Sequence, residues 1–576
     1  MKAIIFVFAF LFSSLNLYSQ TSHLVHEKAP RPKFEDLKLD KNYPHDPMPS
    51  QYPPTGVLIG KMWNAYSTQA SYTNQIFTDP FSGLISVVHR GSRKYPNSGT
   101  IVYQATDDDG ANWTPEVGPM NLPGSLGRHP NIALSNPTKD VTPGAQSVIA
   151  SFPILTTTWH YLEFSSDPTV GSMTFTHFLD STYYPNDEMF INSKGDIFTV
   201  APKIDYQIIG SDTVNMDLFM STNRGVTWTK SPISKTSDFE QDTWNGTKGF
   251  INKNGTGYIM VQGKKSGQNF YSFGYKKTTN DGATWDTNWT WVNPYTIPSL
   301  SGKVHALNYE VDAATDNYGK LHFVGTFLDT LDKSLSGYTG IYHLWGEEIN
   351  WNGELIAKVN RTSLSLPGGL TTLNEVKFAS SWNGTFGVIK FCDIPSQLDS
   401  LYDIFLAGAW GSPKTILNVT NTKNINEKYT QMSSFLYTGV HYFGRVDIMY
   451  TIFGNNDTND LIEAELWYLC GLYFGIYDYA EDDFYPPIKF HLSQNFPNPF
   501  NNQTKLEYYV PYEFDGKVLI KAYNILGKEV ATLVDEHKRE GLHSVTFDGS
   551  NLSSGLYIFE LKANNTVKRV KGILLK

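Results

Sequence analysis

A repeated octapeptide constrains the fold of this chain more than any other feature. The pattern Ser/Thr-x-Asp/Asn-x-Gly-x-x-Trp occurs at residues 106–113, 221–228 and 278–285. Its fixed positions are Thr106, Asp108, Gly110 and Trp113, then Ser221, Asn223, Gly225 and Trp228, and finally Thr278, Asn280, Gly282 and Trp285. The last two copies are 57 residues apart and the first two 115, which leaves room for a degenerate copy at residues 165–167. A fixed period of this size predicts a repeated four-stranded unit.

The residue types of the octapeptide suit a tight turn between two strands. The hydroxyl and the Asp or Asn side chain can hydrogen-bond to the turn backbone, glycine adopts a positive φ, and tryptophan can pack between adjacent sheets. The three segments resemble the Asp box of bacterial neuraminidase (BNR) repeats. The resemblance implies a sialidase-like β-propeller in which the boxes stabilise the fold and take no part in catalysis.

Strand-like runs recur through residues 55–479 at the spacing of the octapeptides. They lie at residues 83–89, 131–134, 195–200, 257–261, 316–324, 386–391 and 445–450. Trp410 and Trp467, which are again 57 residues apart, indicate fainter copies of the turn. We therefore predict an all-β fold, an Asp-box propeller of about seven blades. The six longer blades of the sialidase fold are the alternative.

The C-terminal residues 490–576 form a separate unit of short strand patterns. In Leu556–Leu561 every second residue is apolar, and turn-forming residues such as Gly549 and Gly555 separate the runs. This pattern predicts a small Ig-like β-sandwich. Four segments, 490–500, 517–530, 550–561 and 567–576, resemble in order the type A C-terminal sorting domain of type IX (Por) secretion cargo. The resemblance implies that the secretion machinery binds this domain; an adhesion module without a sorting role is the alternative.

The N-terminal sequence indicates the same route of export. Lys2 precedes the apolar run Ala3–Phe12, which is too short to span a bilayer, so residues 1–20 are a predicted signal peptide. Residues 21–54 are a proline-rich extension, and residues 480–489 are a predicted linker. No later apolar run is long enough for a transmembrane anchor. We expect an extracellular or outer-membrane surface protein, exported through the periplasm.

Net charge, cysteine content and the lack of metal-site patterns limit the partners, disulfides and cofactors that the chain can have. The formal net charge is −10 with no basic tract, which argues against nucleic-acid binding. Cys392 and Cys470 form either one disulfide or two separate buried thiols, and their spacing does not decide between these. No sequence pattern of a metal site is present, and no cofactor is expected.

A sialidase active site requires a clamp of arginines that binds the sugar carboxylate. In this sequence no arginine stands at the position in the repeat where the clamp would begin. Residues 66–77, before the first octapeptide, contain no arginine, and Arg128 comes one blade late. Arg445 follows Tyr442 as in sialidases, but we expect it on an outer strand, and Arg224 lies inside an octapeptide. A glycosidase with a carboxylate pair stays open, because propellers draw such residues from different blades.

Polar residues on the inner strands are the candidates for ligand binding, since these strands line the propeller axis. They are Arg128, His129, Asp187, Glu188, His305, Glu310 and Glu375, and no catalytic residue can be assigned. Trp289, Trp291, Trp345 and Trp351 suit either sugar stacking or packing between blades. We expect a binding or interaction module for a glycan or a surface protein. The alternative is a glycoside hydrolase, sialidase-like or of another propeller type.

Overall fold

A computed structural model gives the fold of the chain, which is all-β apart from two short 3-10 helices among the described residues. The structure describes residues 56–63, 73–155, 159–183, 186–203, 214–240, 246–268, 270, 272–300, 305–329, 340–360, 364–365, 371–372, 374–395, 401–410, 416–422, 425, 427–440, 443–452, 464–469, 472–475, 490–495, 497–510, 516–538, 541–563 and 566–576. The predicted signal peptide, the proline-rich extension and the linker lie outside these ranges.

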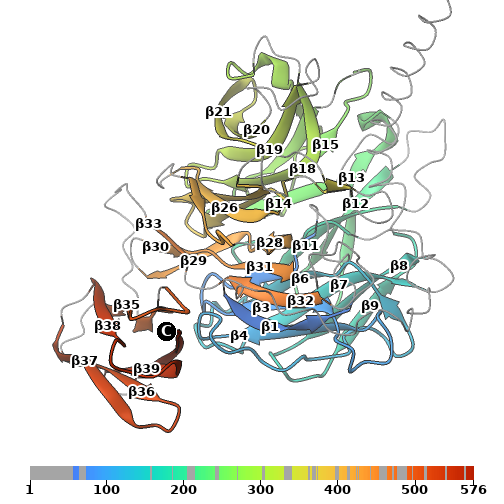
Figure 1. Cartoon of the computed structure of the whole chain (residues 1–576). Coiled ribbons are helices and arrows are strands. Elements are labelled where there is room, and N and C mark those ends of the chain that lie inside the picture. The colour runs from blue at the N-terminus through green and yellow to red at the C-terminus, as the bar shows by residue number, and fades with distance from the viewer. Residues whose placement is uncertain are drawn as a thin grey trace, which may run out of the picture.

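Seven antiparallel sheets in the described part of the chain form the blades of a propeller (Figure 1). Blade one holds β2 (Ile76–Thr78), β3 (Ile85–Arg90) and β4 (Ile101–Thr106), and blade two holds β6 (Asn131–Ser135), β7 (Ser147–Leu155), β8 (Trp159–Asp167) and β9 (Thr176–Asp180) with the short β5 (Leu126–Gly127). Blade three holds β10 (Phe190–Ile191), β11 (Ile197–Pro202), β12 (Val214–Ser221) and β13 (Thr229–Lys235), and blade four holds β14 (Thr247–Ile251), β15 (Gly257–Gly263), β16 (Ser272–Thr278) and β17 (Thr290–Val292). Blade five holds β18 (His305–Thr315), β19 (Leu321–Asp329), β20 (Gly340–Glu347) and β21 (Asn350–Lys358), and blade six holds β24 (Lys377–Ser381), β25 (Gly387–Asp393), β26 (Asp403–Gly408) and β27 (Ile416–Asn418). The predicted blade number is confirmed.

Blade seven closes the ring with strands from both ends of the propeller. It contains β28 (Lys428–Met432), β31 (Ile448–Ile452) and β32 (Ala464–Leu469), and its outer strand is β1 (Val57–Met62). Met62 lies opposite Ala464, and Val57 lies opposite Tyr468. This closure was not predicted from the sequence, because no strand was expected at residues 57–62.

The octapeptides form turns that join neighbouring blades. In blade three the amide of Gly225 donates to Ser221 Oγ at 2.9 Å, and Trp228 Nε1 donates to the Gly225 carbonyl at 3.1 Å. The Trp228 ring stacks on Phe164 of blade two with 4.0 Å between ring centroids. Gly225 has φ +81°, and a Cβ there would lie 2.8 Å from Ile149, so glycine is required on both grounds. In the same way Trp113 packs against Tyr468 of blade seven, and Trp285 packs against Phe198 of blade three.

The fainter copies of the turn differ from one another. Asp167 at the end of β8 accepts a hydrogen bond from Tyr103 OH of blade one at 2.6 Å, so the degenerate copy also joins two blades. Trp410 donates to the Gly384 carbonyl at 3.0 Å. The interpretation of Trp467 as a turn residue is wrong, because Trp467 lies within β32 and donates to Glu465 Oε2 at 3.0 Å. Blade five instead uses Trp351, which no octapeptide marks and which packs against Phe273 of blade four.

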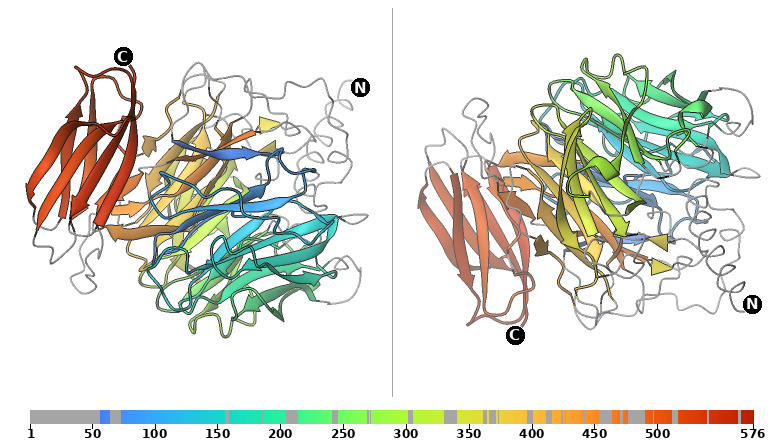
Figure 2. Two further views of the ribbon diagram at one scale, coloured as in Figure 1. Left: turned by 90° about the horizontal axis from the view of Figure 1, so that it is seen from below. Right: turned by 90° about the horizontal axis from the view of Figure 1, so that it is seen from above.

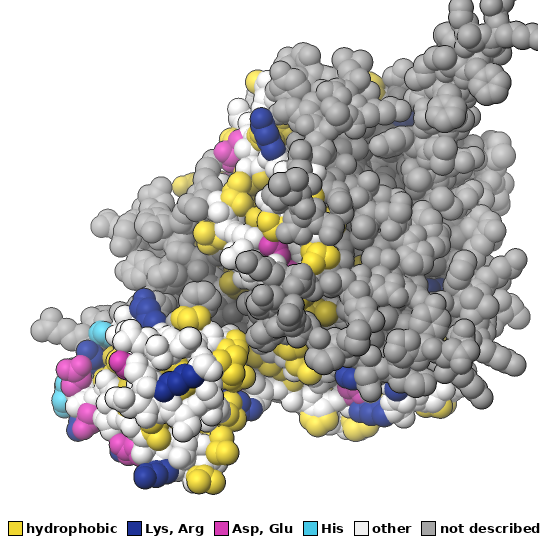
Figure 3. Space-filling view, viewed as in Figure 1, with side chains coloured by type: hydrophobic (Ala, Val, Ile, Leu, Met, Phe, Trp, Pro, Cys, Tyr) yellow, Lys and Arg dark blue, Asp and Glu magenta, His cyan; other side chains and the backbone are white. Residues whose placement is uncertain are grey.

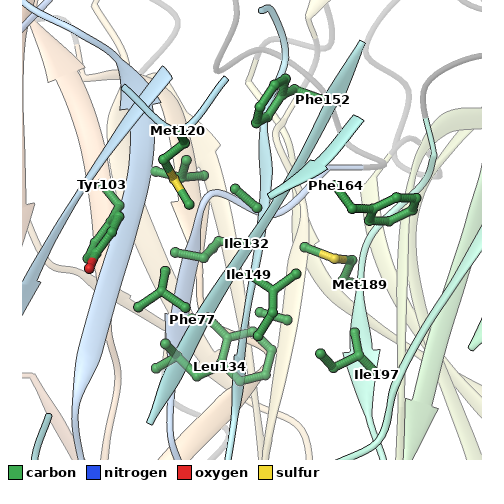
Figure 4. Close-up of a cluster of buried hydrophobic side chains, with 14 of the residues drawn as sticks. Phe77, Tyr103, Met120, Ile132, Leu134, Ile149, Phe152, Phe164, Met189 and Ile197 are labelled. Carbon is green, nitrogen blue, oxygen red and sulfur yellow. The ribbon is translucent and has the colours of Figure 1, made fainter. Parts of the chain in front are cut away.

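The core lies between adjacent blades, since both faces of the inner strands are covered. Figure 4 shows one such cluster, where Phe77 of blade one, Ile132 and Ile149 of blade two and Ile197 of blade three pack together. All four side chains are at most 1% exposed. Burial of apolar area between blades stabilises the ring by about 25 cal/mol per Å².

The C-terminal strands form a two-sheet sandwich beside the propeller (Figures 1 and 2). One sheet has the order β34 (His491–Leu492), β35 (Gln503–Val510), β38 (Gly541–Asp548), and the other β37 (Glu529–His537), β36 (Lys517–Asn524), β39 (Gly555–Ala563), β40 (Thr566–Leu574). Leu506, Ile520, Phe547 and Phe559 are buried in its core. Lys571 Nζ donates to Asn112 Oδ1 of blade one at 3.0 Å, which places the sandwich against the first octapeptide turn.

Candidate functional site

Four charged side chains from successive blades meet at the inner strands. We call Glu188, Lys248, Asp312 and Lys377 the axial charged layer; they come from the segment before β10, from β14, from β18 and from β24, respectively. Lys248 Nζ lies 2.7 Å from Glu188 Oε2, and Lys377 Nζ lies 3.2 Å from the same oxygen. All four residues are at most 4% exposed. A buried charge is tolerated only when it is paired and hydrogen-bonded, and here the pairing is between blades.

The second oxygen of Glu188 is bonded as well. Glu188 Oε1 accepts hydrogen bonds from Ser434 Oγ at 2.6 Å and from Asn74 Nδ2 at 3.3 Å. Lys377 Nζ also donates to the Thr73 carbonyl at 2.9 Å. Glu188 is therefore held by groups of blades one, four, six and seven, and it connects inner strands that are not neighbours in the ring.

The protonation of the layer follows from burial and from these pairs. Burial alone would raise the pKa of the Glu188 carboxyl, but the Lys248 and Lys377 ammonium groups lower it to about 2. Burial lowers the pKa of Lys377 to about 8. Burial also raises the pKa of Asp312, although Lys248 and Lys377 oppose the rise. Glu188 is consequently ionised at neutral pH, while the proton affinity of Asp312 is increased.

An aromatic layer also fills the axis. The Phe435 ring lies 5.6 Å from Phe77, 5.2 Å from Phe250 and 5.3 Å from Trp382, which belong to blades one, four and six. Phe435 begins β29 (Phe435–Val440), which leaves blade seven and pairs in parallel with β24. The amide of Thr78 donates to Ser433 Oγ at 3.0 Å, so the preceding residues are fixed to blade one. Residues 433–435 thus occupy the axis.

Several inner-strand side chains join a blade to its neighbour. Asp187 Oδ2 accepts from both the amide and the hydroxyl of Thr247 at 2.7 Å. Asp312 Oδ2 accepts from the Phe378 amide at 2.8 Å. Glu375 Oε2 accepts from the Thr430 amide at 2.7 Å. Carboxylates in these positions satisfy inner-strand amides, so their contacts are structural.

The structure separates the sequence-predicted ligand residues. Glu188 lies in the axial charged layer, and Glu375 bonds to blade seven. Arg128 and His129, which were expected to line the propeller axis, are only 2% and 8% exposed. His305 and Glu310 lie on β18, but their side chains are outside the described residues.

Sequence reasoning missed three of the four members of the axial charged layer. Lys248 and Lys377 are each the one charged residue of a buried inner strand, Thr247–Ile251 and Lys377–Ser381. A lysine in such a strand was the available signal, because an uncompensated ammonium there would be strongly destabilising. Asp312 gave no comparable signal, since its strand, β18, carries several other polar residues.

Arg445 lies on β30 (Phe443–Arg445), inside the insertion of blade seven, and the expected outer-strand position is wrong. Its Nε donates to Asp447 Oδ1 at 2.8 Å and its Nη2 to the Gly83 carbonyl at 2.8 Å. Nη1 is bonded to Asp109 of the first octapeptide. The guanidinium therefore joins blade seven to blade one and is fully engaged within the protein.

A chain of titratable groups crosses blade five and is buried except at Glu354. His322 Nε2 lies 3.3 Å from Asp316 Oδ2, His322 Nδ1 lies 2.8 Å from His343 Nε2, and His343 Nδ1 lies 3.1 Å from Glu354 Oε1. Burial lowers the pKa of His322 to about 4. Trp410 packs on His322 with 3.9 Å between centroids, so the chain contributes to the packing of blades five and six.

Other candidate chemistry is limited in the described part of the chain. No group of three or more metal-ligating side chains occurs there. No described helix has the length and apolar character needed to cross a membrane. Cys392 is buried, and its Sγ lies 3.2 Å from Thr430 Oγ1. Cys470 is outside the described residues.

A family model matches the C-terminal sandwich. Residues 494–576 match the family of secretion system C-terminal sorting domains. A type IX sorting domain of this kind directs its protein to the cell surface or the extracellular space, and the chain is therefore an exported protein. No curated protein matches the sequence.

Similar solved structures share little sequence with the chain. One is PorZ, an essential surface component of the type-IX secretion system of Porphyromonas gingivalis, with 11% identity and a TM-score of 0.37; the match covers 93% of this chain and 62% of that one. Another is a protein of unknown function from Dyadobacter fermentans, with 11% identity, a TM-score of 0.34 and coverage of 74% and 100%. A third is an alpha-L-arabinanase from Penicillium chrysogenum, with 11% identity, a TM-score of 0.33 and coverage of 60% and 99%.

Proposed function

We propose that this exported protein is a BNR-type propeller that acts outside the cell as a binding module for a glycan or a protein ligand. In this proposal residues 1–20 are the signal peptide, 21–54 an N-terminal extension, 55–479 the propeller, 480–489 the linker and 490–576 the sorting domain. The octapeptide turns support the BNR assignment, because their hydroxyl, glycine and tryptophan make the contacts that the motif requires.

The filled axis is the observation that carries the proposal. A propeller enzyme commonly exposes its acid, base or nucleophile at the axis, where side chains from several blades converge. Here Glu188 is bonded at both oxygens, and Phe435 occupies the same axis among Phe77, Phe250 and Trp382. Such a centre supports a rigid platform whose faces bind a partner.

His305 and Glu310 remain candidates for ligand contact, because both lie on the first part of the inner strand β18. Glu188 and Glu375 serve the structure by their contacts, so we do not assign them to a ligand. Trp289 and Trp351, which are 8% and 6% exposed, are assigned to packing and not to sugar stacking.

A glycoside hydrolase is the second candidate, supported by one observation. Glu188 and Asp312 share one buried layer, and their surroundings shift the pKa of Glu188 down and that of Asp312 up. Opposite shifts in two nearby carboxyls are typical of a general acid and its partner. Catalysis would require the two lysines to release Glu188 when substrate binds.

A glycan array and a panel of chromogenic glycosides separate the two functions. We expect the secreted protein to bind at least one glycan or surface protein and to hydrolyse no glycoside. Turnover that Asp312→Asn abolishes, while binding and melting temperature stay unchanged, would establish the hydrolase. Loss of turnover together with a lower melting temperature would instead reflect damage to the axial charged layer. The turnover rates of Asp312→Asn and Lys248→Met, compared at a temperature where both variants are folded, would then separate loss of a catalytic group from damage to this layer.

A further inference from the structure

The hairpin between β36 and β37 presents two aliphatic side chains to solvent at its tip. Ile525 is 70% exposed and Leu526 is 85% exposed. In the described part of residues 494–576, no other large apolar side chain is more than half exposed; the next most exposed are Leu556, Val567, Ile573 and Leu575, at 37–49%. Two aliphatic groups that stay exposed gain no hydrophobic stabilisation from folding, and they would gain it on contact with a partner, so a conspicuous pair on one small domain indicates a binding surface.

The turn itself is fixed without any contribution from these two side chains. Asn524 Oδ1 accepts hydrogen bonds from the amides of Leu526 and Lys528, both at 3.0 Å. The Gly527 amide donates to the Asn524 carbonyl at 2.9 Å, and Gly527 has φ +74°. Asn524 and Gly527 therefore define the shape of the tip, as expected for these residue types in a tight turn. The backbone that carries Ile525 and Leu526 is therefore preorganised.

The surroundings of the tip are charged. Lys521 Nζ lies 2.7 Å from Glu529 Oε2, and Thr532 Oγ1 donates to Glu529 Oε1 at 2.7 Å. Lys528, next to the turn, is exposed. Charged side chains of both signs also lie across the face of the sandwich seen in Figure 3. An apolar centre with a polar rim is the composition of a protein–protein contact, whereas a lipid-binding surface would present mainly cations.

We propose that Ile525 and Leu526 anchor the sorting domain in an apolar pocket of a protein component of the export machinery. The match of residues 494–576 to a sorting domain identifies the kind of partner, because that domain must be bound during export. The preorganised turn lowers the entropic cost of inserting the two side chains. The proposal concerns export alone and does not depend on the ligand of the propeller.

The test is export of the full chain in a bacterium that carries this secretion system. The variant Ile525→Ser/Leu526→Ser removes the apolar tip, and Ile349→Ser is the matched control. Ile349 is 90% exposed at the hairpin between β20 and β21 of the propeller, so it reports on the loss of an exposed isoleucine elsewhere. Surface and medium fractions are compared with the periplasmic fraction by immunoblotting, and Leu526→Met serves as the conservative variant.

We expect the double serine variant to reach the surface about tenfold less than the wild type, as for loss of an interface anchor, with unchanged melting temperature. Ile349→Ser and Leu526→Met should be exported normally. Normal export of the double variant would overturn the proposal. So would a wild-type protein that binds vesicles of phosphatidylethanolamine and phosphatidylglycerol, or that forms dimers, through the same two residues, because the tip would then serve lipid or a second copy.

Discussion

At the scale of single residues, the axial charged layer depends on one carboxylate. Glu188 neutralises two buried ammonium groups and accepts two further hydrogen bonds, and each of these partners belongs to a different blade. Removing one partner of a buried ion pair leaves an uncompensated charge, which destabilises more than loss of the whole pair. Glu188 should therefore be more sensitive to substitution than any exposed acidic residue.

We expect Glu188→Gln to lower the free energy of unfolding by about 3–5 kcal/mol, because Lys248 and Lys377 would remain buried without a carboxylate. Adding Lys377→Met should recover part of this loss, since one of the two charges is then absent. Urea unfolding followed by tryptophan fluorescence measures both variants. Asp286→Asn, on the exposed face of blade four, is the control. Equal stability of Glu188→Gln and the wild type would contradict the assignment of this layer.

At the scale of elements, the octapeptide turns could be predicted from the sequence, whereas the closing strand could not. All contacts that shape the Ser221–Trp228 turn lie within eight residues, so the residue types alone specify it. The strand β1 pairs with β32, about 400 residues away, and nothing in Val57–Met62 identifies its partner. The misassigned Trp467 shows the same limit, because a 57-residue spacing places a tryptophan without showing whether it lies in a strand or a turn.

The turn tryptophans should behave as parts of the core. Trp228 is 7% exposed and stacks on Phe164, so Trp228→Ala creates a cavity between blades two and three. We expect a loss of about 3–5 kcal/mol in the free energy of unfolding, as for other large aromatic truncations. Val226→Ala is the control in the same turn, because Val226 is 43% exposed. A melting temperature for Trp228→Ala that matches this control would show that the turn does not join the blades.

At the scale of the whole molecule, the architecture could be predicted from the sequence, but the residues that meet at the axis could not. The repeat period and the alternation of apolar residues specify blades and a sandwich, because each unit folds through nearby contacts. The axial layers combine residues from 73 to 435, and only the closed ring brings Glu188 and Ser434 within 2.6 Å. Candidate site residues selected one strand at a time therefore included Glu188 but lacked Lys248 and Lys377.

Buried carboxyls make the stability of the fold depend on pH, and different carboxyls are responsible for its loss at high pH and at low pH. Burial raises the pKa of Glu163 and of Glu427 to about 8, and that of Asp187 to about 7. In the unfolded chain such groups lose their proton near their ordinary pKa, so the folded state binds more protons between the two values. The stability that these groups provide is complete below their ordinary pKa and is lost as pH rises through about 8. Glu188 has the opposite sign: its contribution is lost as pH falls from its ordinary pKa through about 2.

We therefore expect the protein to be most stable in mildly acidic solution and to lose stability toward pH 8.5, and Glu427 should account for part of the loss. Glu427 is fully buried, accepts a hydrogen bond from Thr422 Oγ1 at 2.6 Å, and faces Asp403, whose carboxyl also raises its pKa. A neutral amide at this position resembles the protonated acid. Glu427→Gln should leave the melting temperature nearly unchanged at pH 5 and stabilise the fold by about 1–3 kcal/mol at pH 8.5. Thermal unfolding between pH 4 and 9 tests this, with Glu536→Gln on the exposed sandwich as the control. A gain of equal size at both pH values would show that Glu427 is ionised in the folded protein throughout this range.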